Sequence, residues 1–392
     1  MRLLLVHNIL NDSTSVSGVL REYVNMAREW RELGHTVDFL VARAAFPQLQ
    51  RLAPGVRLVC SDGFFNATGH LDQAWRYLPA YAWRCVTAHF TRLPERYDLI
   101  YATGPFPAEV YPARVIARRM RAKLVVKVQH VLGAQKQRVG LLNHLNLWGE
   151  RLSAGWVNRW ADALFCLSAP VAEDYRRMEE RFGLRPLQTA VVGCGIDLEH
   201  FRTMPEEQKE FDVVFLGRMH ALKGVFDLPH VWREVVRQRP GARLVVIGEG
   251  PHRARMEAMF RELGLEDSVT CTGGISEERK NELLARARVG LSLSSEEGWG
   301  LAVNECLASG LPVVAYDLPV FRHVFPELLD TAPLGDRVEA AARLVALLGD
   351  AKRRGERGGL GRAYVQRYDH RTVARQELVL LEAVAQGKHS LR

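Results

Sequence analysis

Short apolar runs alternate with longer amphipathic stretches along the chain. In the first half, runs rich in Leu, Val and Ile predict buried strands at 3–7, 36–41, 57–59, 99–102, 124–129, 163–167 and 189–192. Apolar residues with helical spacing predict amphipathic helices at 19–33, 108–120, 141–160 and 169–182. The stripe along 141–160 includes Trp148, Trp156 and Trp160, and we expect it in the core.

The second half repeats this pattern. It predicts strands at 212–216, 242–247, 269–272, 289–293 and 312–315, and helices at 225–238, 251–263 and about 371–386. A chain of 392 residues exceeds what one hydrophobic core usually serves. Strand–helix alternation in both halves therefore predicts an α/β protein with two Rossmann-like parallel-sheet domains facing across a cleft.

We place the first domain at 1–200 and the second at 201–370. The polar stretch 202–210 is expected to link them, and the C-terminal helix at about 371–392 is expected to pack back on the first domain. Ligands of such sheets bind at the carboxyl ends of the strands, so the loops that follow strands are where chemistry is expected.

Composition narrows the class of protein. No apolar run reaches the ~20 residues of a membrane-spanning helix. The six cysteines form no CxxC pair, which argues against a disulfide framework or a zinc site and favours a reduced, cytoplasmic protein.

Charge is uneven along the chain. The net charge is +8, and residues 76–138 hold 12 Lys and Arg against 3 Asp and Glu. The basic, aromatic stretch 75–92 suggests either peripheral contact with an anionic membrane surface or an arginine-rich helical hairpin packed on the sheet. We expect no nucleic-acid partner.

A basic loop, 217–224, follows the predicted strand 212–216. Gly217 allows the backbone to approach a ligand closely. Arg218 can bind phosphate oxygens bidentately and Lys223 adds a second cation, so the loop suits a diphosphate. The lysine lacks the following Ser or Thr of a Walker P-loop, and two basic residues in a loop are also common on plain surfaces.

An acidic, glycine-containing loop, 294–300, follows the predicted strand 289–293. A helix is expected to begin near Leu301, which puts Glu297 in the loop and Glu305 in the first turns of the helix. Gly298 and Gly300 leave backbone N–H groups at the helix N-terminus, where anions bind. Carboxylates there can accept hydrogen bonds from sugar or ribose hydroxyls; the plain alternative is an acidic surface loop.

The glycines of 246–251, in Val-Ile-Gly-Glu-Gly-Pro, are weaker evidence for a site. A lone GxG is better explained as a tight turn. No GxGxxG follows the first predicted strand, which disfavours a Rossmann oxidoreductase.

These motifs, in this order, resemble the second domain of the retaining GT-B glycosyltransferases of family 4, also called glycosyl transferases group 1. Two glutamates eight positions apart mark that family, and Glu297 and Glu305 fit this spacing. Arg218 and Lys223 fit its basic loop. The segment 191–201 resembles its interdomain segment, with a departure at 193–194. The match is good over about 190–320 and loose in the first half.

The resemblance implies roles for single residues. It implies that Arg218 and Lys223 bind the donor diphosphate, and that Glu305 binds the ribose. It implies that Glu297 meets the donor sugar, and that His130, after the strand 124–129, lies near that sugar. The remaining donor-binding positions that it implies are glycines and residues of the second motif: Gly18, Gly217, Gly298, Trp299, Gly300 and Leu301.

The resemblance also implies the reaction. A hexosyltransferase of this kind moves a sugar from a nucleotide diphosphate sugar to an acceptor hydroxyl with retention of anomeric configuration, in glycoconjugate or polysaccharide biosynthesis. UDP-sugars are expected because they are the commonest donors in the family. The chain has no DxD motif, so no metal and no other cofactor are expected.

Three points stay open at this level. The acceptor, lipid-linked or polysaccharide among others, cannot be read from the sequence. An NDP-sugar epimerase or a phosphorylase-like enzyme would share the fold, and a non-catalytic nucleotide-sugar-binding protein would share the donor motifs. Location at the inner face of the membrane depends on the basic stretch 75–92.

Overall fold

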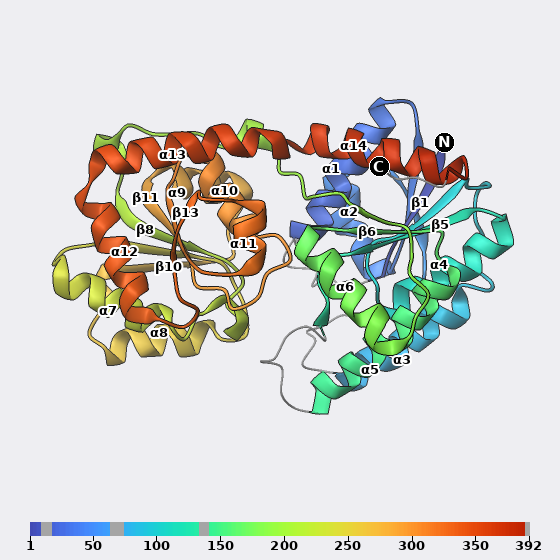
Figure 1. Cartoon of the computed structure of the whole chain (residues 1–392), viewed down its shortest axis with the longest axis horizontal. Helices are drawn as coiled ribbons and strands as arrows, with labels where there is room; N and C mark the ends of the chain where they lie inside the picture. Colours follow the sequence, from blue (N-terminus) through green and yellow to red (C-terminus); the bar gives the residue numbers. More distant parts are fainter. Residues whose placement is uncertain (9–17, 63–73, 133–140, 389–392) are drawn as a thin grey trace. The chain divides into compact units, whose positions relative to one another are not determined.

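A computed structural model describes residues 1–8, 18–62, 74–132 and 141–388 of the chain. It divides into two compact units: unit 1 comprises Met1–Gly195 and His370–Arg392, and unit 2 comprises Ile196–Asp369. Each unit has its own sheet and its own hydrophobic core (Figure 1).

Unit 1 contains a seven-stranded sheet in the order β3-β2-β1-β4-β5-β6-β7, and each neighbouring pair is parallel. The strands are β1 (Arg2–His7), β2 (Thr36–Val41), β3 (Arg57–Cys60), β4 (Leu99–Ala102), β5 (Lys123–Val128), β6 (Ala163–Cys166) and β7 (Thr189–Val191). The helices are α1 (Gly18–Glu32), α2 (Phe46–Leu52), α3 (Ala74–Thr87), α4 (Pro107–Met120), α5 (Leu141–Trp160), α6 (Ala169–Phe182) and α14 (His370–Ala385).

Helices cover both faces of this sheet. Side chains alternate along a strand, so Leu3 and Leu5 pack on one face with α1 and α14, while Leu4 and Val6 pack on the other with α4, α5 and α6. Burial on both faces explains why the strands of unit 1 read as continuous apolar runs in the sequence.

Unit 2 contains a six-stranded parallel sheet in the order β10-β9-β8-β11-β12-β13. The strands are β8 (Phe211–Leu216), β9 (Leu244–Ile247), β10 (Val269–Gly273), β11 (Ala287–Ser292), β12 (Val313–Tyr316) and β13 (Leu329–Ala332). The helices are α7 (Leu228–Gln238), α8 (Arg253–Glu262), α9 (Glu277–Ala285), α10 (Leu301–Ala308), α11 (Pro319–Val324), α12 (Arg337–Gly349) and α13 (Ala351–Val365).

These sheets confirm the prediction of two parallel-sheet α/β domains. Strand β13 was missed, and one smaller expectation was wrong. Trp148 of the stripe along α5 is 65% exposed and does not belong to the core. The stripe continues at Trp156 and Trp160, whose half-buried rings stack on each other with centroids 5.3 Å apart.

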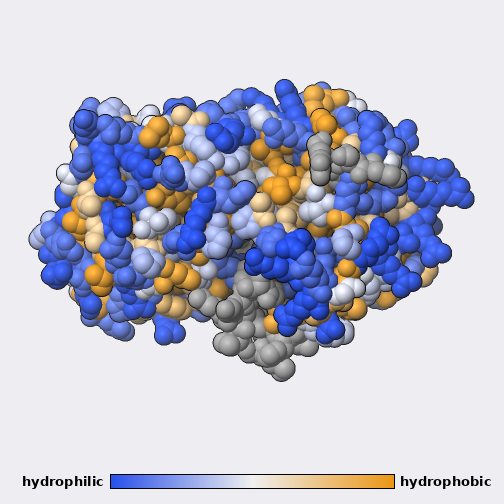
Figure 2. Space-filling model, viewed as in Figure 1, coloured by the Kyte–Doolittle hydropathy of each residue, from blue (hydrophilic) through white to orange (hydrophobic). Residues whose placement is uncertain are grey.

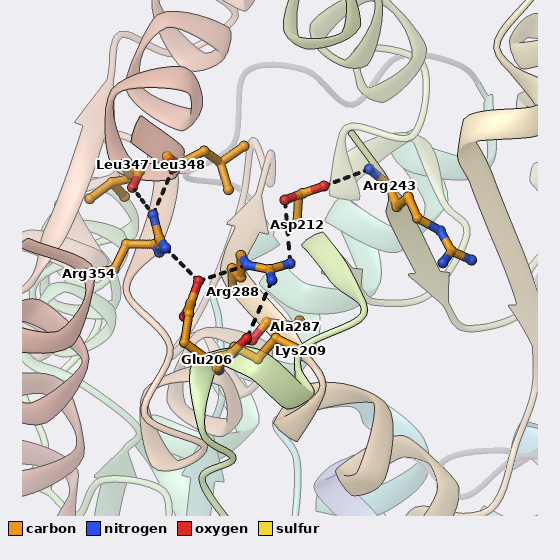
Figure 3. A network of polar contacts seen from close by, with 9 residues as sticks. All are labelled: Glu206, Lys209, Asp212, Arg243, Ala287, Arg288, Leu347, Leu348 and Arg354. Carbon is orange, nitrogen blue, oxygen red and sulfur yellow. Dashed lines mark hydrogen bonds and ion pairs between the residues drawn. The ribbon is translucent and has the colours of Figure 1, made fainter. Parts of the chain in front are cut away.

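The polar stretch 202–210 is not a free linker, because it lies within unit 2 and is bonded to it (Figure 3). The Glu206 carboxylate accepts hydrogen bonds from Arg288 at 2.8 Å and Arg354 at 2.5 Å. Burial works against the charge of Glu206, but the two arginines outweigh it and lower the pKa of this carboxyl. Lys209 donates to the Ala287 carbonyl at 2.6 Å. The passage between the units falls earlier, at Gly195–Ile196.

A buried charged cluster holds α14 within unit 1. The Lys127 ammonium on β5 lies 2.7 Å from Glu22 of α1 and 3.0 Å from Glu377 of α14, and Lys127 and Glu377 are fully buried. Tyr101 of β4 donates its hydroxyl hydrogen bond to Glu377. Burial alone would lower the pKa of Lys127, but the two carboxylates raise it well above its ordinary value.

On the face shown in Figure 2, hydrophilic residues cover most of the surface and apolar ones lie in small groups. Among the residues whose exposure the structure describes, Phe90 has the largest exposed fraction of any large apolar side chain, 79%. None of the described helices is long and apolar enough to cross a membrane.

Candidate functional site

Two loops meet at the carboxyl ends of neighbouring strands β8 and β11. The Lys223 ammonium lies 2.5 Å from Oε1 of Glu297, and the Ser294 hydroxyl donates to the same oxygen at 2.8 Å. The Ser295 N–H donates to the Leu222 carbonyl at 2.9 Å. The basic loop and the acidic loop are far apart in the sequence, since 81 positions separate Gly217 from Gly298, but they form one site.

Glycine allows the close approach of these loops. Gly224 has φ +73°, and a Cβ at this position would lie 2.2 Å from the Leu293 carbonyl oxygen. A larger residue would be strained by its backbone angle and would collide with the main chain of the second loop. Gly224 thus sets the distance between Lys223 and the loop that carries Glu297.

The turn after β9 supports the basic loop from the other side. The Gly217 N–H donates to the backbone carbonyl of Ile247 at 3.1 Å, and the Met219 N–H donates to the backbone carbonyl of Glu249 at 2.9 Å. Gly248 has φ +137°, and a Cβ there would lie 1.9 Å from the Gly217 oxygen. The glycines of 246–251 therefore position the loop that carries Arg218. The sequence had predicted a tight turn here, but not its contact with this loop.

Arg218 is the exposed cation of this site. Its neighbours in the loop, Gly217 and Met219, are held by the backbone bonds to the turn after β9, while its own side chain is exposed. Within the described part of the chain, its guanidinium has no ion-pair partner. It remains available for an anion from solution, whereas Lys223 is already paired with Glu297.

The acidic loop leads directly into α10. Gly300 caps this helix with φ +101°, and a Cβ there would lie 2.6 Å from the ring of Phe321. Trp299 is buried against Tyr368, with ring centroids 4.8 Å apart. Gly298 and Leu301, on either side, are half-buried. Glu297 thus lies in the loop just before the N-terminus of α10, which begins at Leu301.

Glu305 on α10 has a partner that the sequence did not suggest. Its carboxylate lies 2.7 Å from the ammonium of Lys280 on α9, which also lies 2.8 Å from Glu277. Burial works to lower the pKa of Lys280, but Glu305 and Glu277 outweigh it and raise the pKa. Lys280 and Glu305 are 25 positions apart on different helices, so no local spacing in the sequence could reveal the pair.

The other predicted residues belong to unit 1. His130 is half-buried and lies two residues after β5, and Gly18 is the exposed first residue of α1. The structure therefore brings Gly217, Arg218, Lys223 and the residues of the acidic motif together in unit 2, and places His130 and Gly18 in the other unit. No group of three or more metal-ligating side chains occurs among the described residues.

Two family models together match most of the chain. The model of the glycosyl transferases group 1 matches residues 197–350, and that of the glycosyl transferase 4-like domain matches residues 17–195. The chain belongs to the group 1 glycosyl transferases. All unit 2 residues of the candidate site lie in the first match, and Gly18 and His130 lie in the second.

Curated relatives of this group 1 member are distant. It is 27% identical over 198 residues to a GDP-mannose:cellobiosyl-diphosphopolyprenol alpha-mannosyltransferase of Xanthomonas campestris, covering 48% of this chain and 51% of that protein. It is 28% identical over 322 residues to a D-inositol 3-phosphate glycosyltransferase of Acidothermus cellulolyticus, covering 76% of this chain and 70% of that protein. The match to the first relative thus spans about half of that protein's length.

Solved structures share the fold of this group 1 member over nearly its whole length. A sucrose-phosphate synthase from Thermosynechococcus elongatus has a TM-score of 0.80 at 20% identity, covering 98% of this chain and 99% of that one. Anabaena HepE in complex with UDP and glucose has a TM-score of 0.74 at 19% identity, and the match covers 98% of this chain and 100% of that one. These likenesses establish the GT-B fold.

Proposed function

We propose that this chain transfers a sugar from a nucleotide diphosphate sugar to an acceptor hydroxyl, with retention of anomeric configuration. The observation that carries the proposal is the pairing of Lys223 with Glu297 at the carboxyl ends of β8 and β11, with the exposed Arg218 in the same loop as Lys223. Two cations and a carboxylate at this edge suit a ligand that carries both a diphosphate and hydroxyl groups.

The difficult step is cleavage of the bond between the anomeric carbon and the phosphate oxygen, because it leaves negative charge on the diphosphate. Arg218 and Lys223 stabilise that charge with the N–H groups at the start of α10. The acceptor oxygen forms the new bond to the anomeric carbon from the side of the leaving group. Its proton passes to the departing phosphate oxygen, so no protein base is needed.

The carboxylates position the donor. Glu297 accepts hydrogen bonds from sugar hydroxyls while Lys223, 2.5 Å away, offsets its charge. Glu305 accepts from the ribose hydroxyls, and Lys280 offsets its charge in the same way. His130 lies near the transferred sugar, and Gly18 allows the backbone of unit 1 to approach the donor. Unit 2 is the donor-binding domain and unit 1 the acceptor-binding domain.

UDP-sugars are the donors that we propose. The HepE structure contains UDP and glucose, whereas the name of the Xanthomonas relative specifies GDP-mannose. A thermal-shift screen of UDP-, GDP- and ADP-sugars on the wild type, Arg218→Ala and the exposed control Arg261→Ala therefore tests both donor and site. One donor class is expected to raise Tm in the wild type and the control but not in Arg218→Ala. Equal shifts in all three proteins would count against the site.

Product analysis then tests the reaction. Sugar transfer predicts release of the nucleoside diphosphate that depends on an added acceptor hydroxyl. A new nucleotide sugar without acceptor would instead indicate an epimerase, and binding without turnover would indicate a non-catalytic protein.

We also propose that unit 1 contacts the cytoplasmic membrane surface and that the acceptor is lipid-linked or a growing polysaccharide. Trp83, Val86 and Phe90 are exposed in and after α3, and Arg119 donates to the carbonyls of Ala88 and Thr91 in the same segment. Exposed apolar groups with arginine suit an anionic surface. Co-sedimentation with anionic liposomes is expected at low salt and not at high salt; no binding at low salt would contradict the proposal.

A further inference from the structure

Arg84 of α3 is a fully buried arginine at the carboxyl end of β1. Its Nη1 donates to the carbonyl of Asn8, the residue after β1, at 2.5 Å. Its Nε and Nη2 have no hydrogen-bond partner among the residues that the structure describes. These two nitrogens share one edge of the planar guanidinium, the edge with which arginine binds an oxyanion bidentately.

Two residues that are hydrogen-bonded to α3, one by Arg84 and one by Thr87, have buried polar side-chain groups with no partner within the described part of the chain. The groups are Oδ1 of Asn8 and the hydroxyl of Ser61, which follows β3. Asn8 is fixed by its amide, which donates to Ala108 at 2.9 Å, and Ser61 is fixed by Thr87 of α3, whose hydroxyl donates to the Ser61 carbonyl at 2.5 Å. Unpaired buried polar groups are costly and rare, so several at one place indicate a missing partner.

Nearby acids do not supply this partner. Asp62 and Glu109 act on Arg84 electrostatically, but neither accepts a hydrogen bond from it. Both oxygens of Asp62 instead face the Arg43 N–H at 3.2 Å, and Glu109 accepts from the Thr103 hydroxyl at 2.9 Å. Burial disfavours the unpaired guanidinium and lowers the pKa of Arg84, with only partial compensation from its neighbours.

We propose that Arg84, Ser61 and Asn8 form a binding site in unit 1 for a phosphomonoester group carried by the acceptor. Arg84 Nε and Nη2 and the Ser61 hydroxyl donate to the phosphate oxygens. The Asn8 Oδ1, an acceptor, takes a hydroxyl hydrogen from the sugar or polyol that bears the phosphate. The assignment of the ligand as acceptor rests on the proposed function; the oxyanion site itself does not.

The test measures anion-dependent thermal stability in an Arg218→Ala background, which removes phosphate binding by the donor loop. Inorganic phosphate is expected to raise Tm by about 2 °C or more at saturation. Adding Arg84→Met is expected to remove the shift and to weaken phosphate binding roughly 10- to 100-fold. Adding Arg118→Met instead, a change at an exposed arginine of α4, is expected to leave the phosphate-induced Tm shift unchanged.

Folding of the variant is checked by the Tm without anion. Replacing a buried, unpaired charge by an apolar chain of similar length is often neutral or stabilising, so Arg84→Met is expected to unfold at a Tm close to or above that of its parent. Arg84→Lys, which keeps the charge without the planar edge, is expected to bind phosphate weakly. Equal phosphate shifts with and without Arg84 would overturn the site.

Two further ligands identify the source of the phosphate. Glycerol 1-phosphate is expected to stabilise the protein as well as inorganic phosphate does, because an acceptor site must admit an ester. A response to inorganic phosphate alone would indicate a closed ion site, and no response to either would indicate a cluster completed by water; both results would overturn the proposal. Nucleotide-sugar shifts are measured on the Arg84→Met single variant and are expected to equal those of the wild type. If nucleotide sugars do not raise the Tm of the wild type, the proposed function is refuted, but the conclusion about the phosphate site is not affected.

Discussion

The sequence placed the basic and acidic loops at one edge of the sheet because each loop follows its own strand, and the pairing of Lys223 with Glu297 brings the two loops together there. Arg218, Lys223 and Glu297 lie directly after strands that the apolar pattern marks, and the carboxyl ends of parallel strands meet at one edge. Lys280 and Arg84 could not be predicted, because their partners come from other elements and neither belongs to a local motif.

Lys280 is expected to position Glu305. Lys280→Met removes the ammonium and leaves Glu305 and Glu277 without their shared counter-charge, so the carboxylate should turn away from the ribose. We predict a roughly tenfold rise in donor KM with a smaller change in kcat, and recovery in Lys280→Arg. Steady-state kinetics at varied donor concentration measure this; an unchanged KM in Lys280→Met would contradict the role.

His7 is expected to make stability depend on pH. Burial lowers the pKa of this histidine to about 4, against an ordinary 6.5. The unfolded chain therefore binds a proton below about pH 6.5 while the folded protein does not, and the free energy of unfolding falls as pH falls from about 6.5 to about 4. Between pH 7 and pH 4, His7 is expected to lower the free energy of unfolding by about 3 kcal/mol.

Urea denaturation between pH 7 and pH 4 measures this dependence. The slope is expected to be smaller in His7→Gln and unchanged in His89→Gln, whose parent histidine is exposed. An identical slope in the wild type and His7→Gln would show that His7 does not contribute.

Strands and helices with continuous apolar patterns were predicted well. Buried charged residues within the elements were not predicted. Strand β13 has the sequence Leu-Asp-Thr-Ala, and its Asp330 is buried because Arg353 of α13 pairs with it. The helix α14 was predicted, but its buried Glu377 was not, because the groups that stabilise its charge, Lys127 on β5 and Tyr101 on β4, are distant in the sequence. For Trp148 the error is the opposite one: an apolar residue that was predicted to be buried is exposed, because not every position of an apolar helix stripe faces the core.

The charged cluster under α14 is expected to be essential for unit 1. Lys127→Met leaves Glu22 and Glu377 buried together without a cation, which should lower the free energy of unfolding by about 3–5 kcal/mol at pH 7. Lys123→Met on the same strand removes an exposed pair with Asp162 and should cost about 0–1 kcal/mol. Urea denaturation of the two variants gives the comparison; equal losses would contradict the role of the cluster.

At the scale of the whole molecule, strand–helix alternation over 392 residues was enough to predict two parallel-sheet domains, because each sheet buries both faces and marks its strands clearly. The passage between the units was less predictable. Polar residues at 202–210 suggested a linker, yet Glu206 and Lys209 are bonded to unit 2. Polarity along a sequence does not distinguish a free segment from one held by ion pairs.

In the proposed reaction, Arg218 and Lys223 bind the diphosphate of the donor. Isothermal titration of the nucleoside diphosphate and the corresponding monophosphate, in the nucleotide class that the thermal screen selects, tests it most directly. We predict that the wild type binds the diphosphate on the order of 100-fold more tightly than the monophosphate, and that this ratio falls to within a few-fold in Arg218→Ala and Lys223→Ala. A ratio that is unchanged in both variants would contradict the account.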